Sequence, residues 1–214
     1  MTRIALIHAL SHSVRPINEV FDSYWPQALR MNLLDDSLSA DLARTRLLDD
    51  AMDDRFAALA SYALSTGADG ILFTCSAFGP CIERVAQAHP HVPILKPNEA
   101  MIDELRGGTG KLGLIATFEP TLQSMPREFG NEIELELGLA RGALAALEQG
   151  DALEHDRLIV EEARKLHANG CSRLALAQVS MARASAACAT ATGLRISTTV
   201  ESAIRAFRLR LRAD

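Results

Sequence analysis

The chain has 214 residues, a formal net charge of −5 and 48% hydrophobic residues, enough for one large or two small domains. The acidic balance and the lack of a basic aromatic patch argue against nucleic-acid binding, and no apolar run approaches the roughly 20 residues of a membrane helix. The amino terminus does not resemble a signal peptide, and the four cysteines without a CxxC pair are typical of reduced thiols. We therefore expect a cytoplasmic α/β protein with neither a membrane nor a nucleic acid as partner.

Strands and helices are predicted to alternate along the first half. Apolar runs predict strands at residues 4–7, 29–34, 71–74 and 92–95, and helices are predicted at 13–24, 49–65, 79–88 and 99–106. The helix at 49–65 has an apolar stripe at helical spacing and a stop at Gly67, and Asn98 is placed to cap the last helix. This alternation is typical of parallel sheets covered by helices on both faces.

The second half is predicted to repeat the alternation. Strands are expected at 112–116, 132–137, 174–178 and 194–197, and helices at 120–129, 151–168, 181–191 and 201–210. The glycine-rich segment 107–110 is interpreted as the turn between the halves. It precedes a strand and carries no GKS/T pattern, so it does not fit a phosphate-binding loop.

Three pairs of segments match in the same order, at a spacing of roughly 100 residues. They are 3–10 with 111–118, 67–77 with 170–180, and 94–102 with 196–204. A repeat of this length indicates a domain duplication, because solenoid units repeat at roughly 20–50 residues. We expect an α/β half over 1–106 and a second over 107–198, with a carboxyl-terminal helix over 199–214 packing back on the first half.

Cys75 is the strongest candidate for a catalytic side chain. It is predicted to end a central strand, and ligands bind at the carboxyl ends of parallel strands. Backbone N–H groups and the helix after Pro80 are expected to lower its pKa toward neutrality, which suits proton transfer. The alternative is a buried structural cysteine. The other three cysteines, Cys81, Cys171 and Cys188, are interpreted as packing residues.

His8 ends the first predicted strand and is expected at the same edge as Cys75, with Ser11 just beyond it. The alternative for His8 is a hydrogen-bonded structural role. His8 and His12 are four residues apart without the glutamate of a zinc helix, so no metal site is predicted.

The segment Gly-Ala-Asp-Gly-Ile-Leu-Phe-Thr-Cys-Ser-Ala at 67–77 resembles the first cysteine motif of the aspartate/glutamate/hydantoin racemase superfamily, and Leu-Ile-Ala-Thr at 114–117 resembles its second-half opening strand. The resemblance implies two flavodoxin-like parallel-sheet halves related by a pseudo-twofold axis. It also implies a cleft between the halves, no cofactor and a small-molecule carboxylate as partner, with a homodimer as one option. The substrate-binding residues expected from position are His8, Ser11, Ser76, Ala77, Thr117, Thr121, Gln178, Val179 and Ser180.

The chain departs from the racemase pattern because the position matching Cys75 in the second half is Gln178. A single thiol is similar to the arrangement in arylmalonate decarboxylase, and maleate isomerase, normally a two-thiol enzyme, is another relative in the superfamily. We therefore expect a cofactor-independent lyase or isomerase that uses Cys75 as acid/base or nucleophile. The alternatives are an amino-acid or hydantoin racemase with a non-cysteine second base such as His8, and a non-catalytic carboxylate-binding protein.

Overall fold

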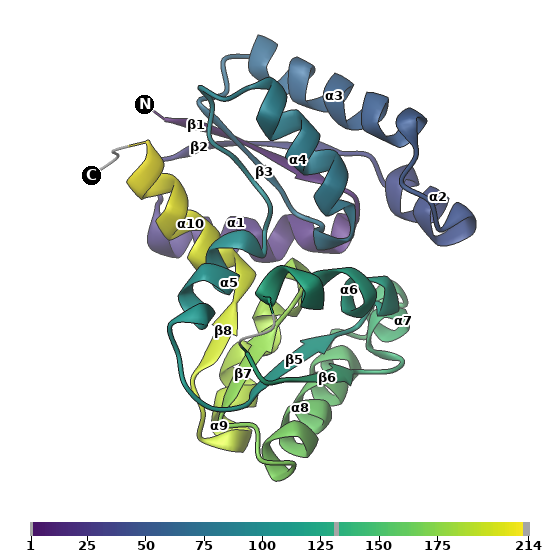
Figure 1. Ribbon diagram of the computed structural model, residues 1–214, viewed down its shortest axis with the longest axis vertical. Helices are drawn as coiled ribbons and strands as arrows, with labels where there is room; N and C mark the ends of the chain where they lie inside the picture. Colours follow the sequence, from purple (N-terminus) through teal and green to yellow (C-terminus); the bar gives the residue numbers. More distant parts are fainter. Residues whose placement is uncertain (1, 131–132, 212–214) are drawn as a thin grey trace. The chain divides into compact units, whose positions relative to one another are not determined.

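The computed structural model describes residues 2–130 and 133–211 and divides into two compact units. The first unit takes the chain up to Glu99 and from Val200 onward, and the second takes Ala100–Thr199. Each unit is a parallel α/β sheet with helices on both faces (Figure 1).

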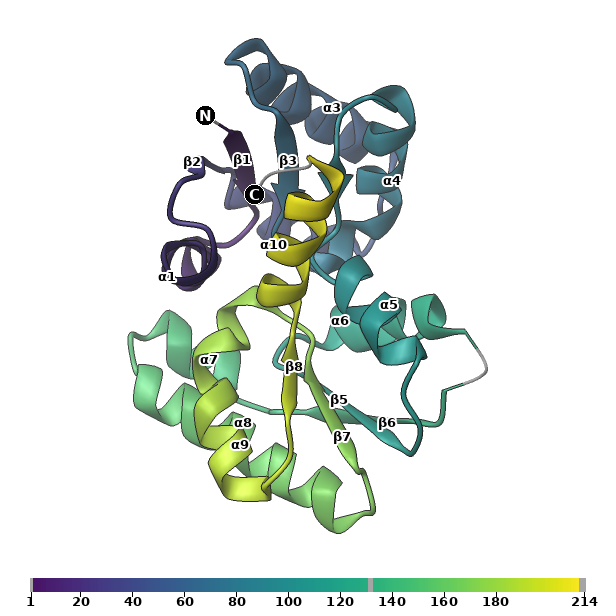
Figure 2. The ribbon, with the colours of Figure 1, turned by 90° about the vertical axis from the view of Figure 1, so that its left-hand side faces the viewer.

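The first unit is built on the strand order β2-β1-β3-β4, with all pairs parallel. Its strands are β1 (Arg3–His8), β2 (Leu29–Leu34), β3 (Gly70–Phe73) and β4 (Ile94–Leu95). Its helices are α1 (Val14–Tyr24), α2 (Ser37–Thr45), α3 (Asp50–Ser65), α4 (Gly79–Ala88) and α10 (Thr199–Arg210). Helices α3 and α4 cover one face of this sheet, and α1 and α10 cover the other (Figure 2).

The second unit has the corresponding order β6-β5-β7-β8, again all parallel. Its strands are β5 (Leu112–Ala116), β6 (Leu135–Leu139), β7 (Arg173–Leu176) and β8 (Ile196–Thr198). Its helices are α5 (Glu99–Arg106), α6 (Glu119–Ser124), α7 (Ala143–Glu148), α8 (Ala152–Ala168) and α9 (Ser185–Thr192). The identical order of the two sheets confirms the predicted α/β duplication, and it is the order of flavodoxin-like folds.

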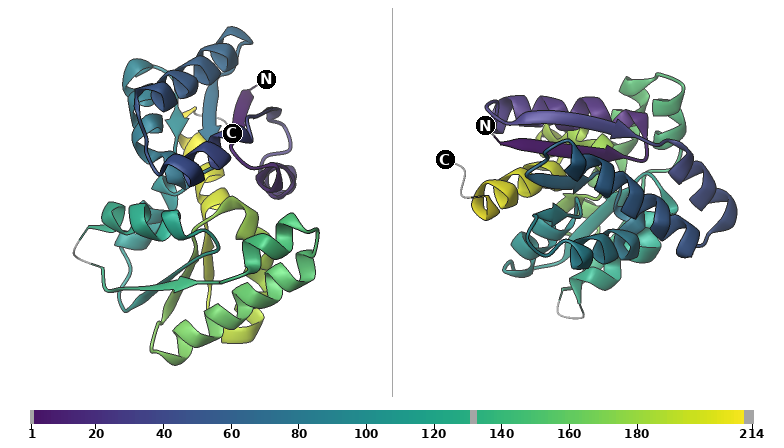
Figure 3. Two further views of the ribbon diagram at one scale, coloured as in Figure 1. Left: turned by 90° about the vertical axis from the view of Figure 1, so that its right-hand side faces the viewer. Right: turned by 90° about the horizontal axis from the view of Figure 1, so that it is seen from above.

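The core of the second unit lies on both faces of its sheet. One cluster joins Ile115 to α8 and α9, and the other joins Leu114 to α5 and to the segment around Phe129. The long green helix α8 therefore lies along one face (Figure 3). Because adjacent residues of a strand point to opposite faces, a central strand buried on both sides must be apolar throughout, as β5 is.

Several observed helices were missed or are shorter than predicted, each for a local reason. Helix α2 was not predicted, because its two buried residues, Leu38 and Leu42, stand in a short polar and acidic stretch. Helix α7 has only six residues, too few to show a helical period. The predicted helices at 120–129 and 181–191 each combine a 3-10 segment with a shorter α-helix. Residue 132, predicted to begin a strand, lies outside the described residues; the observed strand β6 begins at Leu135.

The last helix of each sequence half belongs to the opposite unit. Helix α5 contributes Met101, Ile102 and Leu105 to a core of the second unit, so the division falls one helix earlier than residue 106. Helix α10 packs in the first unit, where a Cβ on Gly70 would lie 2.9 Å from Cε1 of Phe207. Residues 212–214 of the predicted terminal helix lie outside the described residues.

Gly67 and Gly170 occupy equivalent positions after α3 and α8, and both have positive φ, +84° and +90°. We predict that Gly170→Ala lowers the free energy of unfolding by about 1–2 kcal/mol, because an L side chain is strained in this region. The matched control is Gly107→Ala, at a position with neither a positive φ nor a heavy atom within 4 Å of the added Cβ. Urea denaturation measures both, and equal effects would contradict the assignment of strain to Gly170.

Candidate functional site

Cys75 follows the fully buried strand β3 and begins a change of direction in the chain. It has extended backbone angles, φ −122° and ψ 117°, and precedes the 3-10 segment Ser76–Phe78 and helix α4. Both Ser76 and Ala77 are buried there, and Ser76 Oγ has no hydrogen-bond partner among the described residues. The residue after the Cys75 thiol therefore carries a buried hydroxyl whose hydrogen-bonding capacity is unused in the described part of the chain.

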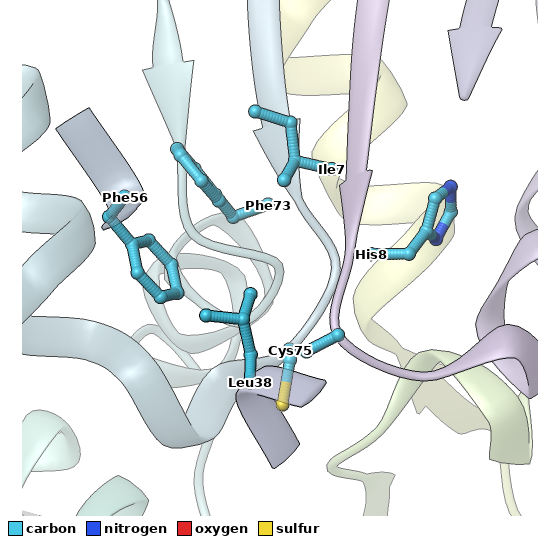
Figure 4. A pocket seen from close by; sticks show the side chains of 7 residues that line it. Ile7, His8, Leu38, Phe56, Phe73 and Cys75 are labelled. Carbon is cyan, nitrogen blue, oxygen red and sulfur yellow. The ribbon is translucent and has the colours of Figure 1, made fainter. Parts of the chain in front are cut away.

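The Cys75 side chain lines a small apolar recess of the first unit (Figure 4). The recess is too tight to hold a water molecule, and its other lining residues are Ile7, His8, Ala9, Leu38, Phe56 and Phe73. In Figure 4 the side chain of Leu38, which lies on the unpredicted helix α2, stands beside Cys75 and lines the same recess. Helix α2 thus supplies one wall beside the thiol.

The pKa of Cys75 corrects the expectation of an activated thiolate. Burial raises the pKa to about 11, although the backbone N–H of Ala77 lowers it in part. Removing water disfavours the charged form of a thiol more than this single N–H favours it. Cys75 is therefore protonated near neutral pH. Cys81, Cys171 and Cys188 are buried in the cores, which confirms them as packing residues.

His8 is fully buried and has both ring nitrogens in hydrogen bonds. Nδ1 lies 2.9 Å from Ser13 Oγ and 3.0 Å from Thr74 Oγ1, and Nε2 lies 3.0 Å from Asn32 Oδ1. The Asn32 atom also accepts from Asn18 Nδ2, which identifies it as the amide oxygen. Nε2 therefore carries the proton and Nδ1 accepts one from a hydroxyl.

The surroundings of His8 keep its imidazole neutral. Burial lowers the pKa to about 4, against the raising effect of the hydrogen bond to Asn32. The imidazole points away from the sulfur of Cys75 (Figure 4), although both residues line the recess. These contacts favour the alternative that His8 has a hydrogen-bonded structural role. Substrate binding by this residue stays a prediction. Ser11 lies exposed in the following 3-10 segment.

In the second unit, Gln178 accepts three hydrogen bonds at one atom. Its Oε1 lies 2.6 Å from Thr117 N, 3.0 Å from Thr117 Oγ1 and 3.2 Å from Phe118 N. These groups stand at the carboxyl ends of β5 and β7, as the repeat predicted for Thr117 and Gln178. Three further residues expected at the site, Thr121, Val179 and Ser180, are buried next to them in sequence.

Sequence reasoning missed Asn32 and Leu38. Asn32 carried no clear signal, because it is an exposed residue of the edge strand β2, where polar side chains are ordinary. Leu38 carried no signal either, because its helix was not predicted. Among the described residues no group of three or more His, Cys, Asp or Glu side chains can hold a metal ion. No helix of the described part is both long and apolar enough to cross a membrane.

Comparisons with known proteins agree with this geometry. The family model described as Asp/Glu/Hydantoin racemase matches residues 12–207, whereas a search of curated protein sequences finds no significant match. A glutamate racemase structure from Francisella tularensis is 15% identical with a TM-score of 0.73, covering 99% of this chain and 81% of its own. An allantoin racemase from Klebsiella pneumoniae is 14% identical with a TM-score of 0.74, at 99% and 88% coverage. The Picrophilus torridus aspartate racemase is 12% identical with a TM-score of 0.71, at 98% and 94% coverage.

At these identities the solved structures establish the fold, and the family match covers most of the chain. Two units with the same parallel strand order define a duplicated α/β fold, and in the first of them a cysteine follows β3. The chain belongs to the Asp/Glu/hydantoin racemase family.

We predict that stability depends on pH through His8. Its pKa is lowered from 6.5 to about 4 in the folded protein. Between these values the unfolded chain binds a proton that the folded protein does not, so stability is full above pH 6.5 and falls toward pH 4. Lowering the pH from about 7.5 to about 4.5 should cost about 2–3 kcal/mol through this residue.

The measurement is urea denaturation at a series of pH values for the wild type and His8→Gln. The variant is less stable at neutral pH but lacks this part of the pH dependence. Parallel pH profiles for the two proteins would show that His8 does not titrate in this way.

We also predict that Arg55 holds helix α2 over the thiol. Its guanidinium lies 2.9 Å from Asp41 Oδ2 and 2.8 Å from Asp35 Oδ2, at the two ends of the segment that carries Leu38. Arg55→Gln should speed the reaction of Cys75 with a small thiol reagent about fivefold, since partly exposed ion pairs contribute about 1 kcal/mol to closure.

The matched control is Arg15→Gln, which removes the exposed Arg15–Glu19 pair on α1. Cys75→Ser identifies the kinetic phase that belongs to this thiol. An unchanged rate in Arg55→Gln would mean that α2 does not limit access.

Proposed function

We propose that the protein is a cofactor-independent lyase or isomerase that acts on a small carboxylate, with Cys75 as its proton donor. The single observation that carries this proposal is the difference between the two equivalent strand ends. Cys75 stands at one of them, and Gln178, with its Oε1 in three hydrogen bonds, stands at the other. An amide does not titrate near neutral pH, so one of the two positions can donate a proton and the other cannot.

The protonated state of Cys75 fits a lyase reaction of the decarboxylating type. When a carboxylate leaves the substrate as CO2, its bonding electron pair remains on the α-carbon. The S–H proton of Cys75 then forms the new C–H bond, and the thiolate takes a proton back from solvent. A thiol with a raised pKa returns to its acid form readily, because burial disfavours the thiolate.

The electron pair on the α-carbon is delocalised into the remaining carboxylate or a neighbouring carbonyl, and that oxygen needs hydrogen-bond donors. We place this role on the strand-end residues of the repeat. The amide of Gln178 is the donor that we propose for this oxygen, and Ser76, whose Oγ is buried without a partner among the described residues, is proposed as a substrate-binding residue. Ser11, Ala77, Thr121, Val179 and Ser180 remain the further substrate-binding residues that we propose from their positions.

Racemisation of an amino acid or hydantoin is the second candidate, because the matching family carries that activity in its description. Such a reaction needs a second group that accepts or donates a proton. His8 is the titratable residue at the corresponding edge of the first sheet, and its burial and low pKa disfavour it in that role. The third candidate is a carboxylate-binding protein without turnover.

Thermal unfolding in the presence of malonates, maleate, hydantoins and amino acids identifies the ligand class, because a ligand of the folded state raises the unfolding temperature. Turnover of each stabilising compound is then followed by proton NMR in deuterated solvent. We predict that Cys75→Ser lowers kcat at least about 100-fold, the usual contribution of a positioned acid or base, and leaves the unfolding temperature nearly unchanged.

The control is Cys188→Ala, which removes a thiol from the core of the second unit. It should lose some stability and keep its turnover. Incorporation of solvent deuterium at the α-carbon of an amino acid, accompanied by loss of its optical purity, would contradict the lyase proposal and favour the racemase. Ligand binding without any turnover would favour the third candidate, a carboxylate-binding protein that is not an enzyme.

A further inference from the structure

The three hydrogen bonds at Gln178 Oε1 determine which end of the side-chain amide points toward Thr117 and Phe118. We propose that Thr117 and Phe118 hold the Gln178 amide in one orientation, so that its Nε2 group is a fixed donor for a substrate carboxylate. Thr117 is then a positioning residue that acts through Gln178. The inference rests on the proposed function, from which it takes the carboxylate as ligand. It adds that Gln178 binds the carboxylate and that Thr117 orients Gln178.

The orientation of the amide follows from the chemistry of its neighbours. Backbone N–H groups can only donate, and two of them, from Thr117 and Phe118, lie 2.6 Å and 3.2 Å from the same side-chain atom. That atom must therefore be the oxygen, and the NH2 group must be the other end of the amide. Reversing the amide would place N–H against N–H at both contacts, which costs two hydrogen bonds.

The Thr117 hydroxyl strengthens the same arrangement. Its Oγ1 lies 3.0 Å from Oε1 of Gln178, and a hydroxyl has a single proton to donate. Thr117 is 7% exposed, so both of its donors are committed to Gln178 in a largely buried place. A substrate oxygen reaches these donors only by displacing the Gln178 side chain.

The NH2 end of Gln178 has the opposite character. Its side chain is partly exposed, and Nε2 makes no hydrogen bond within the described part of the chain. Two N–H bonds at the carboxyl edge of the sheet are thus available to an acceptor. Carboxylate oxygens are acceptors only, and a donor whose orientation is already fixed loses little entropy on binding them.

Thr117→Val tests the positioning role, because valine has nearly the shape of threonine and lacks the hydroxyl. We expect it to weaken malonate binding, measured by calorimetry, about tenfold in the wild-type background. Thr117→Ser, which keeps the hydroxyl, should restore most of the affinity. In a Gln178→Ala background, the Thr117→Val change should have almost no further effect, since its action passes through Gln178.

An equal effect of Thr117→Val in both backgrounds would overturn the proposal, because Thr117 would then contact the ligand directly. Side-chain amide resonances of Gln178 give a readout without ligand. The pair, identified by its loss in Gln178→Ala, should move toward the position of exposed glutamines in Thr117→Val and stay in Thr117→Ser. Unchanged resonances in Thr117→Val would contradict the positioning role of the Thr117 hydroxyl, because the two backbone N–H groups would then hold the amide without it.

Gln178→Glu separates the two ends of the side chain. A carboxylate still accepts from all three donors, so the fold should be kept, but the outward N–H groups are replaced by an acceptor that repels anions. Malonate affinity should fall more than tenfold, and an unchanged affinity would overturn the donor role. If kcat is reduced, it should fall less than the affinity.

These outcomes are independent of the role of Cys75. Failure of the wild type to bind malonate overturns the present proposal whatever the turnover shows. If Thr117→Val weakens malonate binding only when Gln178 is present, and Cys75→Ser keeps full activity, the role of Thr117 is supported and Cys75 is rejected as the proton donor.

Discussion

Parallel pairing brings the carboxyl ends of β1 and β3 to one edge of the first sheet, and those of β5 and β7 to one edge of the second. Backbone groups beyond the last paired residue have lost their strand partners and need other hydrogen bonds. Side chains at this edge meet that need. Gln178 accepts from the N–H groups of Thr117 and Phe118, while Ser13 Oγ, which also lies 2.9 Å from His8 Nδ1, donates to the carbonyl of Leu10. The same polar residues therefore complete the fold and form the candidate site.

In the first unit this requirement conflicts with reactivity. The recess that positions Cys75 is apolar, and such surroundings stabilise the thiol over the thiolate. His8 is also buried, and burial lowers its pKa to about 4, so its imidazole does not take up a proton near neutral pH. We place the lyase before the racemase for this reason, because a neutral thiol can deliver a proton to a strong carbon base but cannot itself remove one from a weak carbon acid.

The two units share a backbone plan but differ in chemistry. Their strand orders are the same, and glycines with positive φ stand at equivalent places after α3 and α8. The strand ends have nevertheless diverged, to a thiol in one unit and an amide in the other. A duplicated fold tolerates this change because strand-end side chains are held by hydrogen bonds at the edge, whereas the duplicated backbone depends on the buried apolar strands.

The sequence by itself determined the alternation of strands and helices, the duplication, and that Cys75 lies at the carboxyl edge of the first sheet and Thr117 and Gln178 at that of the second. Apolar periodicity, glycine stops and strand ends are local signals, and each depends on residues close together in the chain. Only the tertiary structure decided that Gln178 bonds to Thr117, 61 residues away, that His8 meets Asn32, and that Leu38 flanks the thiol. Such contacts depend on strand register and on the packing of α2, which no local pattern records. Burial likewise set the pKa values of Cys75 and His8, because solvent exclusion belongs to the folded unit and not to the residue type.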